Sequence, residues 1–321
     1  KGKKAHADKW RIRVTRDPEQ LRPGEIWCAD HRLFDVMVRL NDDLDSRVFR
    51  PILTIFIDLC SADSIGWVIR EQPSSEGVAA AIRRGCLGFQ EVTDQGEMTV
   101  WPARGLPDTV IIDNGREFWG GAMAAACDWE PAETDFVPDT RHRTVLTQLG
   151  VKEIQCIPFN PQSKPIEAWF TALANMENTL PGWTGRDSKE KPECLRPQTK
   201  RGELMTLSHL RGRIARLFWE RRFGPHVGHR RQFSPATYWE NATIRPVDAA
   251  HLDDLLCRDG FVTPTNSFIE IKGMGMYAPI EQHQSLFLDA RGTRCKRLFA
   301  RDDPRFVILH AGAARIVLRR L

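Results

Sequence analysis

Three acidic residues lie where strand-like segments end or a helix begins. At such positions a side chain can reach the edge of a sheet and contact a substrate. Asp30 closes the run GEIWCAD, Asp113 follows the apolar run VII, and Glu167 opens the run that continues AWF. Carboxylate oxygens are the ligands that Mg²⁺ prefers, and two such ions can activate a nucleophile and stabilise the leaving oxygen of a phosphodiester. Three carboxylates meeting at one point would therefore predict metal-dependent phosphoryl transfer. Taken alone, Asp113, which stands directly before Asn-Gly, is better explained as an ordinary turn residue.

The segments that must position these carboxylates alternate between strand-like and helix-like patterns. Strands are expected at 24–30, 33–40, 50–60, 108–113 and 152–159, and helices at 74–89, 120–129, 140–150, 166–180 and 203–223. Short polar turns join the first three strands, which indicates an antiparallel meander, whereas the strand–helix–strand order that follows indicates parallel pairing. Ser74 or Ser75 is the expected N-cap of the first helix, and Gly150 is expected to end the third.

This order of elements is that of an RNase H-like mixed five-stranded sheet with flanking helices, an α/β fold. In such a sheet the fourth strand lies beside the first, so Asp113 would end next to the strand that carries Asp30. Glu167 would open the helix after the fifth strand. All three side chains would then face one point at the edge of the sheet.

Composition divides the chain into three parts. Residues 1–22 are expected to be a basic linker or arm, 23–245 the α/β core, and 246–321 a small all-β barrel, because short alternating runs with Gly and Pro are typical of such barrels. DNA binding is a separate expectation for this barrel. The arm carries a net charge of +5, residues 23–170 carry −10 and residues 171–321 carry +9, within a total of +4. An acidic middle between basic flanks suits a metal-dependent enzyme that acts on a polyanion, although charge runs are usually solvated faces. The start at Lys-Gly-Lys-Lys, without a methionine, leads us to expect further domains upstream.

Composition and spacing also disfavour several classes of protein. No run of about 18 apolar residues is present, so no membrane span is expected. The eight cysteines form no C-x-x-C pair, which argues against a zinc ribbon or a disulfide framework and fits small buried residues in a reducing cytoplasm. His226 and His229 have no cysteine or carboxylate at ligand spacing, so we expect surface or DNA-facing residues there. Tyr238 and Tyr277 stand in no recombinase-like motif, which disfavours tyrosine recombinase chemistry.

Four segments carry a resemblance to a known family. They are ADHRLFDVMVRL, RPILTIFIDLCSADSIGW, VIIDNGREFWGG and NPQSKPIEAWF. Together they resemble the DDE transposase/retroviral integrase superfamily, and most closely the Mu-type phage transposases. The similarity covers about 23–240, and the β-rich segment that follows is similar to the C-terminal barrel of Mu-type transposases. The 53 residues between Asp113 and Glu167 exceed the compact spacing of retroviral integrases, as an insertion or longer helices over 119–149 would in Mu-type members.

The resemblance implies a DNA transposase that nicks the 3′ ends of a mobile element and transfers them into target DNA. It implies that Asp30, Asp113 and Glu167 are the catalytic residues and also the ligands of Mg²⁺ or Mn²⁺, with two ions per site. The partners it implies are DNA (element ends and target), further copies of the chain in a homo-multimer assembled on DNA, and an accessory target-delivery protein. The expected location is the cytoplasm of a prokaryote, with the gene carried by the cell or by a phage. Two alternatives stay open: an RNase H-like nuclease that cleaves without joining, and a non-catalytic, transposase-derived DNA-binding or assembly protein.

Other acidic and aromatic residues compete for roles near this site. Asp58 also follows an apolar run and is the main rival to Asp30, which the family motif favours. Turn or surface positions are expected for Asp35, Asp42 and Asp63. Glu117 is expected to be at most a neighbour of the metal site. Trp169 and Phe170 are expected to be core residues of their helix and not base-stacking platforms.

Basic and amide side chains near the acidic site are candidate DNA contacts. They are Asn114, Lys164, Arg211, Arg213, Arg216, Arg221, Arg222, Arg230 and Arg231. Contacts of this kind to DNA phosphates would make binding weaken steeply with salt. Each of these candidates has an alternative of equal weight: Asn114 could be a turn residue, Lys164 could be solvated, and the arginines could be exposed to solvent on a helix surface. Gln162 and Ser163 share the ambiguity of Lys164.

Overall fold

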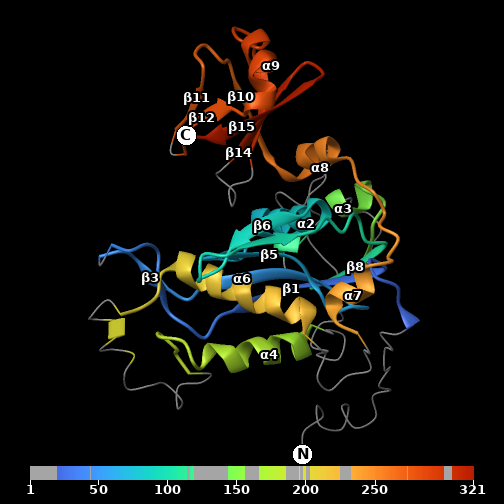
Figure 1. The fold of residues 1–321 in the computed structure, drawn as a ribbon, viewed down its shortest axis with the longest axis vertical. Helices are drawn as coiled ribbons and strands as arrows, with labels where there is room; N and C mark the ends of the chain where they lie inside the picture. Colours follow the sequence, from blue (N-terminus) through green and yellow to red (C-terminus); the bar gives the residue numbers. More distant parts are fainter. Residues whose placement is uncertain are drawn as a thin grey trace, which may run out of the picture.

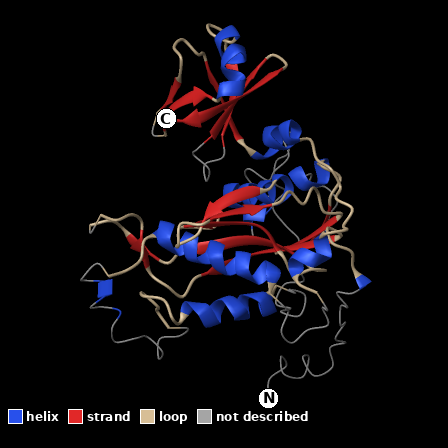
Figure 2. Ribbon diagram, viewed as in Figure 1, coloured by secondary structure: helices blue, strands red, loops and turns tan. Residues whose placement is uncertain are grey.

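The chain folds into an α/β core and a β-rich C-terminal part, which Figures 1 and 2 show one above the other. The structure is a computed structural model. It describes residues 20–43, 45–113, 116–118, 144–155, 166–185, 195, 198–199, 203–224, 233–272, 274–299 and 306–321. The helix expected at 120–129 lies outside these ranges.

The core is built on a mixed five-stranded sheet in the order β5-β4-β1-β8-β9. Its strands are β1 (Ile26–Leu33), β4 (Ile52–Asp58), β5 (Ser64–Arg70), β8 (Thr109–Ile112) and β9 (Lys152–Gln155). β1, β4 and β5 pair antiparallel, whereas β8 runs parallel to both β1 and β9. This is the RNase H-like arrangement that the sequence predicted, and it puts the strand before Asp113 beside the strand that contains Asp30.

The second and third strands of the meander differ from those expected. After β1 the chain leaves the sheet, because the amides of Met37 and Arg39 donate to the carbonyls of Gly182 and Met205. β2 (Val38–Arg39) therefore forms a separate two-stranded sheet with β3 (Val48–Phe49). β4 takes the second place, and β5, which sequence reasoning missed, takes the third. The missed turn has no Gly or Pro: Ala62 has a φ of +57°, which non-glycine residues adopt uncommonly.

Helices cover both faces of the sheet (Figure 1). α2 (Ser75–Leu87) and α8 (Ala249–Leu256) bury apolar side chains on the face that carries Trp27 and Phe56. α4 (Glu167–Glu177) and α6 (Leu207–Phe223) bury theirs on the opposite face, which carries Cys28 and Ile111. This division follows from β1, whose successive side chains point to alternate faces.

The ends of two helices follow the sequence signals. The hydroxyl of Ser74 accepts from the amide of Gly77 at 3.1 Å, so Ser74 is the N-cap of α2. Gly150 has a φ of +70° after the short helix α3 (Val145–Gln148), which confirms its role in ending that helix. The remaining short elements of the core are the hairpin β6 (Phe89–Val92) and β7 (Met98–Trp101), η2 (Arg116–Phe118) and α7 (Pro235–Trp239).

The C-terminal part is a six-stranded antiparallel sheet that curls into a nearly closed barrel (Figure 2). Its elements are β10 (Arg258–Val262), β11 (Ile269–Ile271), β12 (Gly275–Pro279), η5 (Glu281–His283), α9 (Gln284–Asp289), β13 (Cys295–Phe299), β14 (Phe306–Ala311) and β15 (Ala314–Arg320). Tyr277, Phe287 and Leu309 are buried at its centre. The all-β fold class expected for this part is confirmed. The domain limits at residues 22 and 245 remain predictions.

Among the helices that the structure describes, none has the length and apolar character needed to cross a membrane.

Candidate active site

The register of β1 and β8 brings two of the three predicted carboxylates to one level of the sheet. The last pair of this parallel ladder is Cys28 with Ile111. Asp30 and Asp113 follow two residues later on their respective chains, so continuation of the register sets them side by side. Because alternate residues share a face, both point to the face of Cys28 and Ile111. Asp30 is 9% exposed and Asp113 is half-buried.

α4 covers that same face, and Glu167 is its first residue. Phe170 and Glu177 follow Glu167 by three and ten residues, a spacing that keeps all three positions on one side of a helix. Phe170 and Glu177 both contact Arg32 of β1. Position 167 therefore lies on the sheet-facing side of α4, one turn before Phe170. The side chain of Glu167 itself is outside the described residues.

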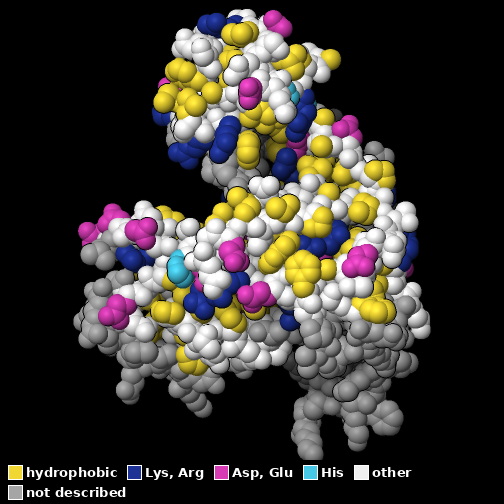
Figure 3. All heavy atoms as spheres, in the orientation of Figure 1, with side chains coloured by type: hydrophobic (Ala, Val, Ile, Leu, Met, Phe, Trp, Pro, Cys, Tyr) yellow, Lys and Arg dark blue, Asp and Glu magenta, His cyan; other side chains and the backbone are white. Residues whose placement is uncertain are grey.

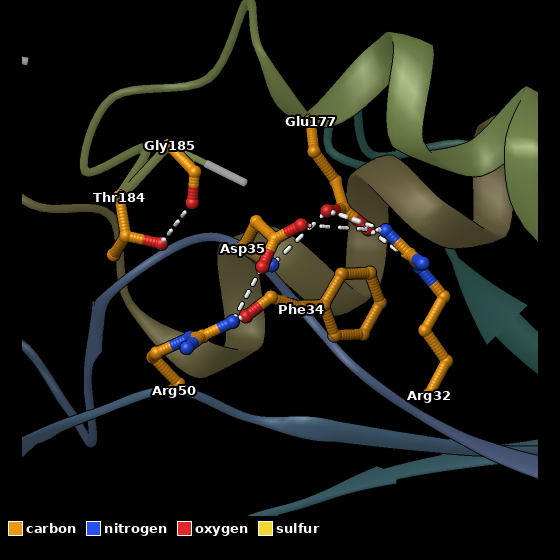
Figure 4. A network of polar contacts seen from close by, with 7 residues as sticks. All are labelled: Arg32, Phe34, Asp35, Arg50, Glu177, Thr184 and Gly185. Atoms are coloured by element: carbon orange, nitrogen blue, oxygen red, sulfur yellow. Dashed lines mark hydrogen bonds and ion pairs between the residues drawn. The ribbon is translucent and has the colours of Figure 1, made fainter. Parts of the chain in front are cut away.

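Arg32 and Glu177 join β1 to α4 through a buried ion pair (Figure 4). The Nε of Arg32 donates to Oε1 of Glu177 at 3.0 Å, and its Nη2 donates to Oε2 at 2.9 Å. The backbone amide of Asp35 also donates to Oε2 of Glu177, at 3.0 Å, and Asp35 is paired in turn with Arg50. Burial raises the pKa of the Glu177 carboxyl, whereas the neighbouring Arg32 lowers it.

Sequence reasoning missed this ion pair, although the sequence carries a signal for each member. Arg32 follows Asp30 by two residues and so shares its face of β1. Glu177 is an acidic residue on the same stripe of α4 as the buried Phe170 and Leu173. A charge on each of two apposed buried surfaces indicates a pair, because an unpaired charge there would be costly to bury.

The backbone and side chain of His31 engage both sides of the strand. Its amide donates to Oδ1 of Asp30 at 2.8 Å, which orients that carboxylate. Its ring lies on the opposite face, where Nδ1 is 2.8 Å from the hydroxyl of Thr54 and Nε2 is 3.4 Å from Oε1 of Glu117. The ring also packs on Phe118, with centroids 4.7 Å apart. Glu117 thus faces His31, and η2, which follows Asp113, is held against β1.

Asp58, the rival to Asp30, lies toward the other end of the sheet. It pairs with Trp27, whereas Asp30 pairs with Ile55, and three residues of strand span about 10 Å. Its carboxylate accepts from the amide of Gly24 at 2.9 Å and from the amide and hydroxyl of Ser61, both at 2.7 Å. Burial raises its pKa to about 6. Asp58 therefore closes the turn between β4 and β5, away from Asp113.

Two further expectations about this region can be compared with the structure. Trp169 and Phe170 are buried in the core between α4 and the sheet, which confirms that they are core residues. Asp63 was expected at a turn or on the surface; it lies in the turn between β4 and β5, but it is 2% exposed and so is not a surface residue. It is buried because Arg104 and Arg222 pair with its two carboxylate oxygens at 3.0 and 3.2 Å.

The five arginines of α6 have partners inside the protein. Carboxylates of the β6–β7 hairpin and of the turn before β5 pair with four of them: Arg211 with Glu91, Arg213 and Arg216 with Asp94, and Arg222 with Asp63. The guanidinium of Arg221 lies over the ring of Trp169 at 5.6 Å. These contacts fasten α6 to the core, and a second role for the arginines in DNA binding remains a prediction.

Several candidate positions lie outside the described residues. They are Asn114, Gln162, Ser163, Lys164, His226, His229, Arg230 and Arg231. Within the described part of the chain, no group of three or more His, Cys, Asp or Glu side chains is arranged to hold a metal ion. The side chain of Glu167, which the acidic site would require, is not among the described residues.

Comparison of the sequence with known proteins points to one class. Residues 29–143 match the family model described as the TnsB C-terminal domain, and this range includes both Asp30 and Asp113. Over this range the chain is therefore similar to a transposase family. A Mu-type assignment within the transposase/integrase superfamily remains a prediction.

A particular relative is the transposase for transposon Tn552 of Staphylococcus aureus. It is 30% identical over 118 residues, which are 36% of this chain and 22% of that protein, so the match spans less than a quarter of the relative. Among solved structures, the HTLV-2 integrase catalytic core domain in complex with magnesium is 13% identical, with a TM-score of 0.36, 68% of this chain covered and 97% of that one. For the catalytic core domain of BIV integrase these values are 13%, 0.28, 67% and 93%.

Proposed function

We propose that this chain is the catalytic part of a DNA transposase that nicks DNA at element ends and joins the 3′ ends to target DNA. The observation that carries the proposal is the parallel register of β1 and β8. Continued by two residues beyond its last pair, Cys28 with Ile111, this register would bring Asp30 and Asp113 to one level, on the face of the sheet that α4 covers. In this proposal Glu167, at the first turn of α4, provides the third carboxylate.

Divalent metal ions are part of the proposal because the donor set suits them. Three carboxylates supply the hard oxygen ligands that Mg²⁺ and Mn²⁺ take. When bound, two ions would supply Lewis-acid activation and charge neutralisation at the scissile phosphate. Asp30, Asp113 and Glu167 would hold them.

The proposed reaction needs no nucleophile from the protein. In the first step the oxygen of a water molecule bonds to phosphorus and the bond from phosphorus to the 3′ oxygen breaks, which leaves a 3′-hydroxyl and a 5′-phosphate. In the second step that 3′-hydroxyl attacks a phosphodiester of the target and displaces another 3′ oxygen. Each step exchanges one phosphorus–oxygen bond for another, so no oxidant or reductant enters.

DNA is the proposed substrate, and the C-terminal barrel is a proposed contact surface for it. Figure 3 shows Lys and Arg side chains gathered on the part of the barrel nearest the core. β15 alone carries Arg315, Arg319 and Arg320. A basic surface of this kind attracts the phosphates of DNA without reading sequence. A Mu-type arrangement and a homo-multimer assembled on paired ends belong to the same proposal.

Replacement of Asp113 tests the proposal directly. We expect Asp113→Asn to reduce nicking of supercoiled plasmid in Mn²⁺ by about 100-fold or more, because a lost metal ligand removes several kcal/mol of transition-state stabilisation. Asp108→Asn is the matched control: Asp108 precedes the same strand but pairs with Arg22 on the surface, and this variant should nick like the wild type. Equal nicking by Asp113→Asn and the wild type would refute the assignment.

The products distinguish the proposed transposase from its alternatives. A labelled duplex with a free 3′-hydroxyl, incubated with plasmid and Mn²⁺, should become covalently joined to the plasmid. Cut plasmid without joined product would indicate a nuclease. Absence of both from wild-type protein that binds DNA would indicate a non-catalytic DNA-binding or assembly protein.

A further inference from the structure

We propose that Arg32 and Glu177 are positioning residues that set the place of α4, and with it Glu167, relative to the strand that carries Asp30. The inference rests on the proposed function, in which Glu167 and Asp30 serve one site. Neither Arg32 nor Glu177 is placed at the metal or at the substrate. Their proposed effect is transmitted through the helix.

The apolar contacts of α4 hold it against the sheet but leave its position along the sheet weakly defined. Ile166, Trp169, Phe170 and Leu173 are buried against β1, β8 and α6. Burial of apolar surface is non-directional, so a small slide or rotation of the helix changes its energy little. A metal site tolerates much less, because carboxylate oxygens must meet the ion at a fixed distance.

The ion pair between Arg32 and Glu177 restricts the position of α4 along the sheet, which the apolar contacts do not. A guanidinium that donates two parallel bonds to one carboxylate is restricted in angle as well as in distance. Here the two bonds of 3.0 and 2.9 Å join Arg32 to Glu177, and the third bond from the Asp35 amide ties the carboxylate to the backbone after β1. Glu177 is completely buried, so water does not compete for it. Figure 4 shows the three groups converging on this carboxylate.

We call the bonded pair of Arg32 and Glu177 the clamp, and its place along α4 determines which part of the helix it fixes. α4 begins at Glu167 without a side-chain cap on its first turn, and Glu177 is its last residue. The ion pair with Arg32 therefore holds α4 at the end of the helix opposite to Glu167. Because a helix is stiff over three turns, fixing the register at Glu177 fixes the height of position 167, about 15 Å away. Arg32 lies two residues beyond Asp30, so the clamp fixes α4 relative to the same strand that provides the first carboxylate.

Two conservative variants test the clamp. Glu177→Gln keeps the size of the side chain and loses its charge, and Arg32→Lys keeps the charge and loses the two-bond fork. We expect each to raise amide hydrogen exchange in residues 166–177 at least tenfold while exchange in α2 is unchanged. We expect each to lower the nicking rate at saturating Mn²⁺ by between about tenfold and 100-fold, the range for residues that orient metal ligands. The KM for plasmid should change less than threefold.

Ile82→Val is the control for general loss of stability. Ile82 is buried on the opposite face of the sheet, in the α2 core, and its truncation should lower the melting temperature without changing exchange in α4 or the nicking rate. Unchanged exchange of α4 in Glu177→Gln would overturn the clamp whatever the activity. Raised exchange with nicking no lower than in Ile82→Val would overturn its positioning role.

The proposed function fails separately, if Asp113→Asn nicks as fast as the wild type. In that case the exchange of α4 still decides whether Arg32 and Glu177 hold the helix.

Discussion

The pH dependence of stability can be predicted from Asp58, the completely buried carboxyl that closes the turn between β4 and β5. Burial raises its pKa from the ordinary 3.8 to about 6 in the folded protein. Between these values the unfolded chain loses the proton and the folded protein keeps it. The contribution of Asp58 to stability is therefore fully present below pH 3.8 and is lost as the pH rises through about 6.

The size of the effect follows from the same two values. At about 1.36 kcal/mol per pKa unit, the difference between 3.8 and about 6 corresponds to about 3 kcal/mol. Other carboxyl groups titrate over the same range, so the wild type must be compared with a variant in which only Asp58 cannot ionise. Asp58→Asn is that variant, because the amide retains an oxygen acceptor for Ser61.

The measurement is urea unfolding of both proteins, followed by tryptophan fluorescence at several pH values from 4 to 7. The unfolding free energy of the wild type minus that of Asp58→Asn should fall by about 2 kcal/mol across this range, because at pH 4 the unfolded chain has already lost much of the proton. A difference that stays constant within about 0.5 kcal/mol, or one that rises with pH, would refute the reasoning. A rise would mean that the hydrogen bonds from Gly24 and Ser61 outweigh burial. Nicking by Asp58→Asn should match the wild type, since Asp58 lies away from Asp113.

Two more predictions concern packing and DNA binding. Gly66→Ala should lower the unfolding free energy by about 3 kcal/mol or more, because the new Cβ would lie 2.0 Å from the carbonyl oxygen of Ala81; a loss below about 1 kcal/mol in urea unfolding would contradict this. Arg213→Ala should reduce the slope of log affinity for nonspecific duplex against log salt by about one. Arg213 is available to DNA because its distance of 3.8 Å to Asp94 is long for an ion pair and its side chain is 34% exposed. Arg222→Ala should leave that slope unchanged and instead destabilise the protein by about 3 kcal/mol, because Arg222 is buried beside Asp63. The opposite pattern in the two arginine variants would show that their roles are exchanged.

Local patterns predicted most of the core sheet. β1, β4, β8 and β9 each lie in or across a segment with the expected strand pattern, and Ser74 and Gly150 end their helices as their types indicate. β5 was missed because the turn before it is closed by the side chain of Asp58 and by a non-glycine residue with positive φ, Ala62. Such a turn has no Gly or Pro to mark it.

In the candidate site, too, local sequence predicted some features and the tertiary structure decided others. The residue types of Asp30, Asp113 and Glu167, and their places at the ends of strands and at the start of a helix, can be read from the sequence because each depends on neighbours within a few residues. Which carboxylate lies near Asp113 depends on pairing between distant strands. The β1–β8 register, continued two residues past Cys28 and Ile111, favours Asp30, whereas Asp58 lies toward the other end of the sheet.

Partners of buried charges were decided by the tertiary structure alone. The arginines of α6 could equally have faced solvent or DNA, and the fold supplies Glu91, Asp94 and Asp63 as their partners. Glu177 meets Arg32 across 145 residues of chain. A charge can be removed from water only where an opposite charge is brought to meet it, and that meeting depends on the packing of whole elements. The sequence by itself therefore determined which groups could do chemistry, and the packing of α4 and α6 on the sheet determined which of them lie together.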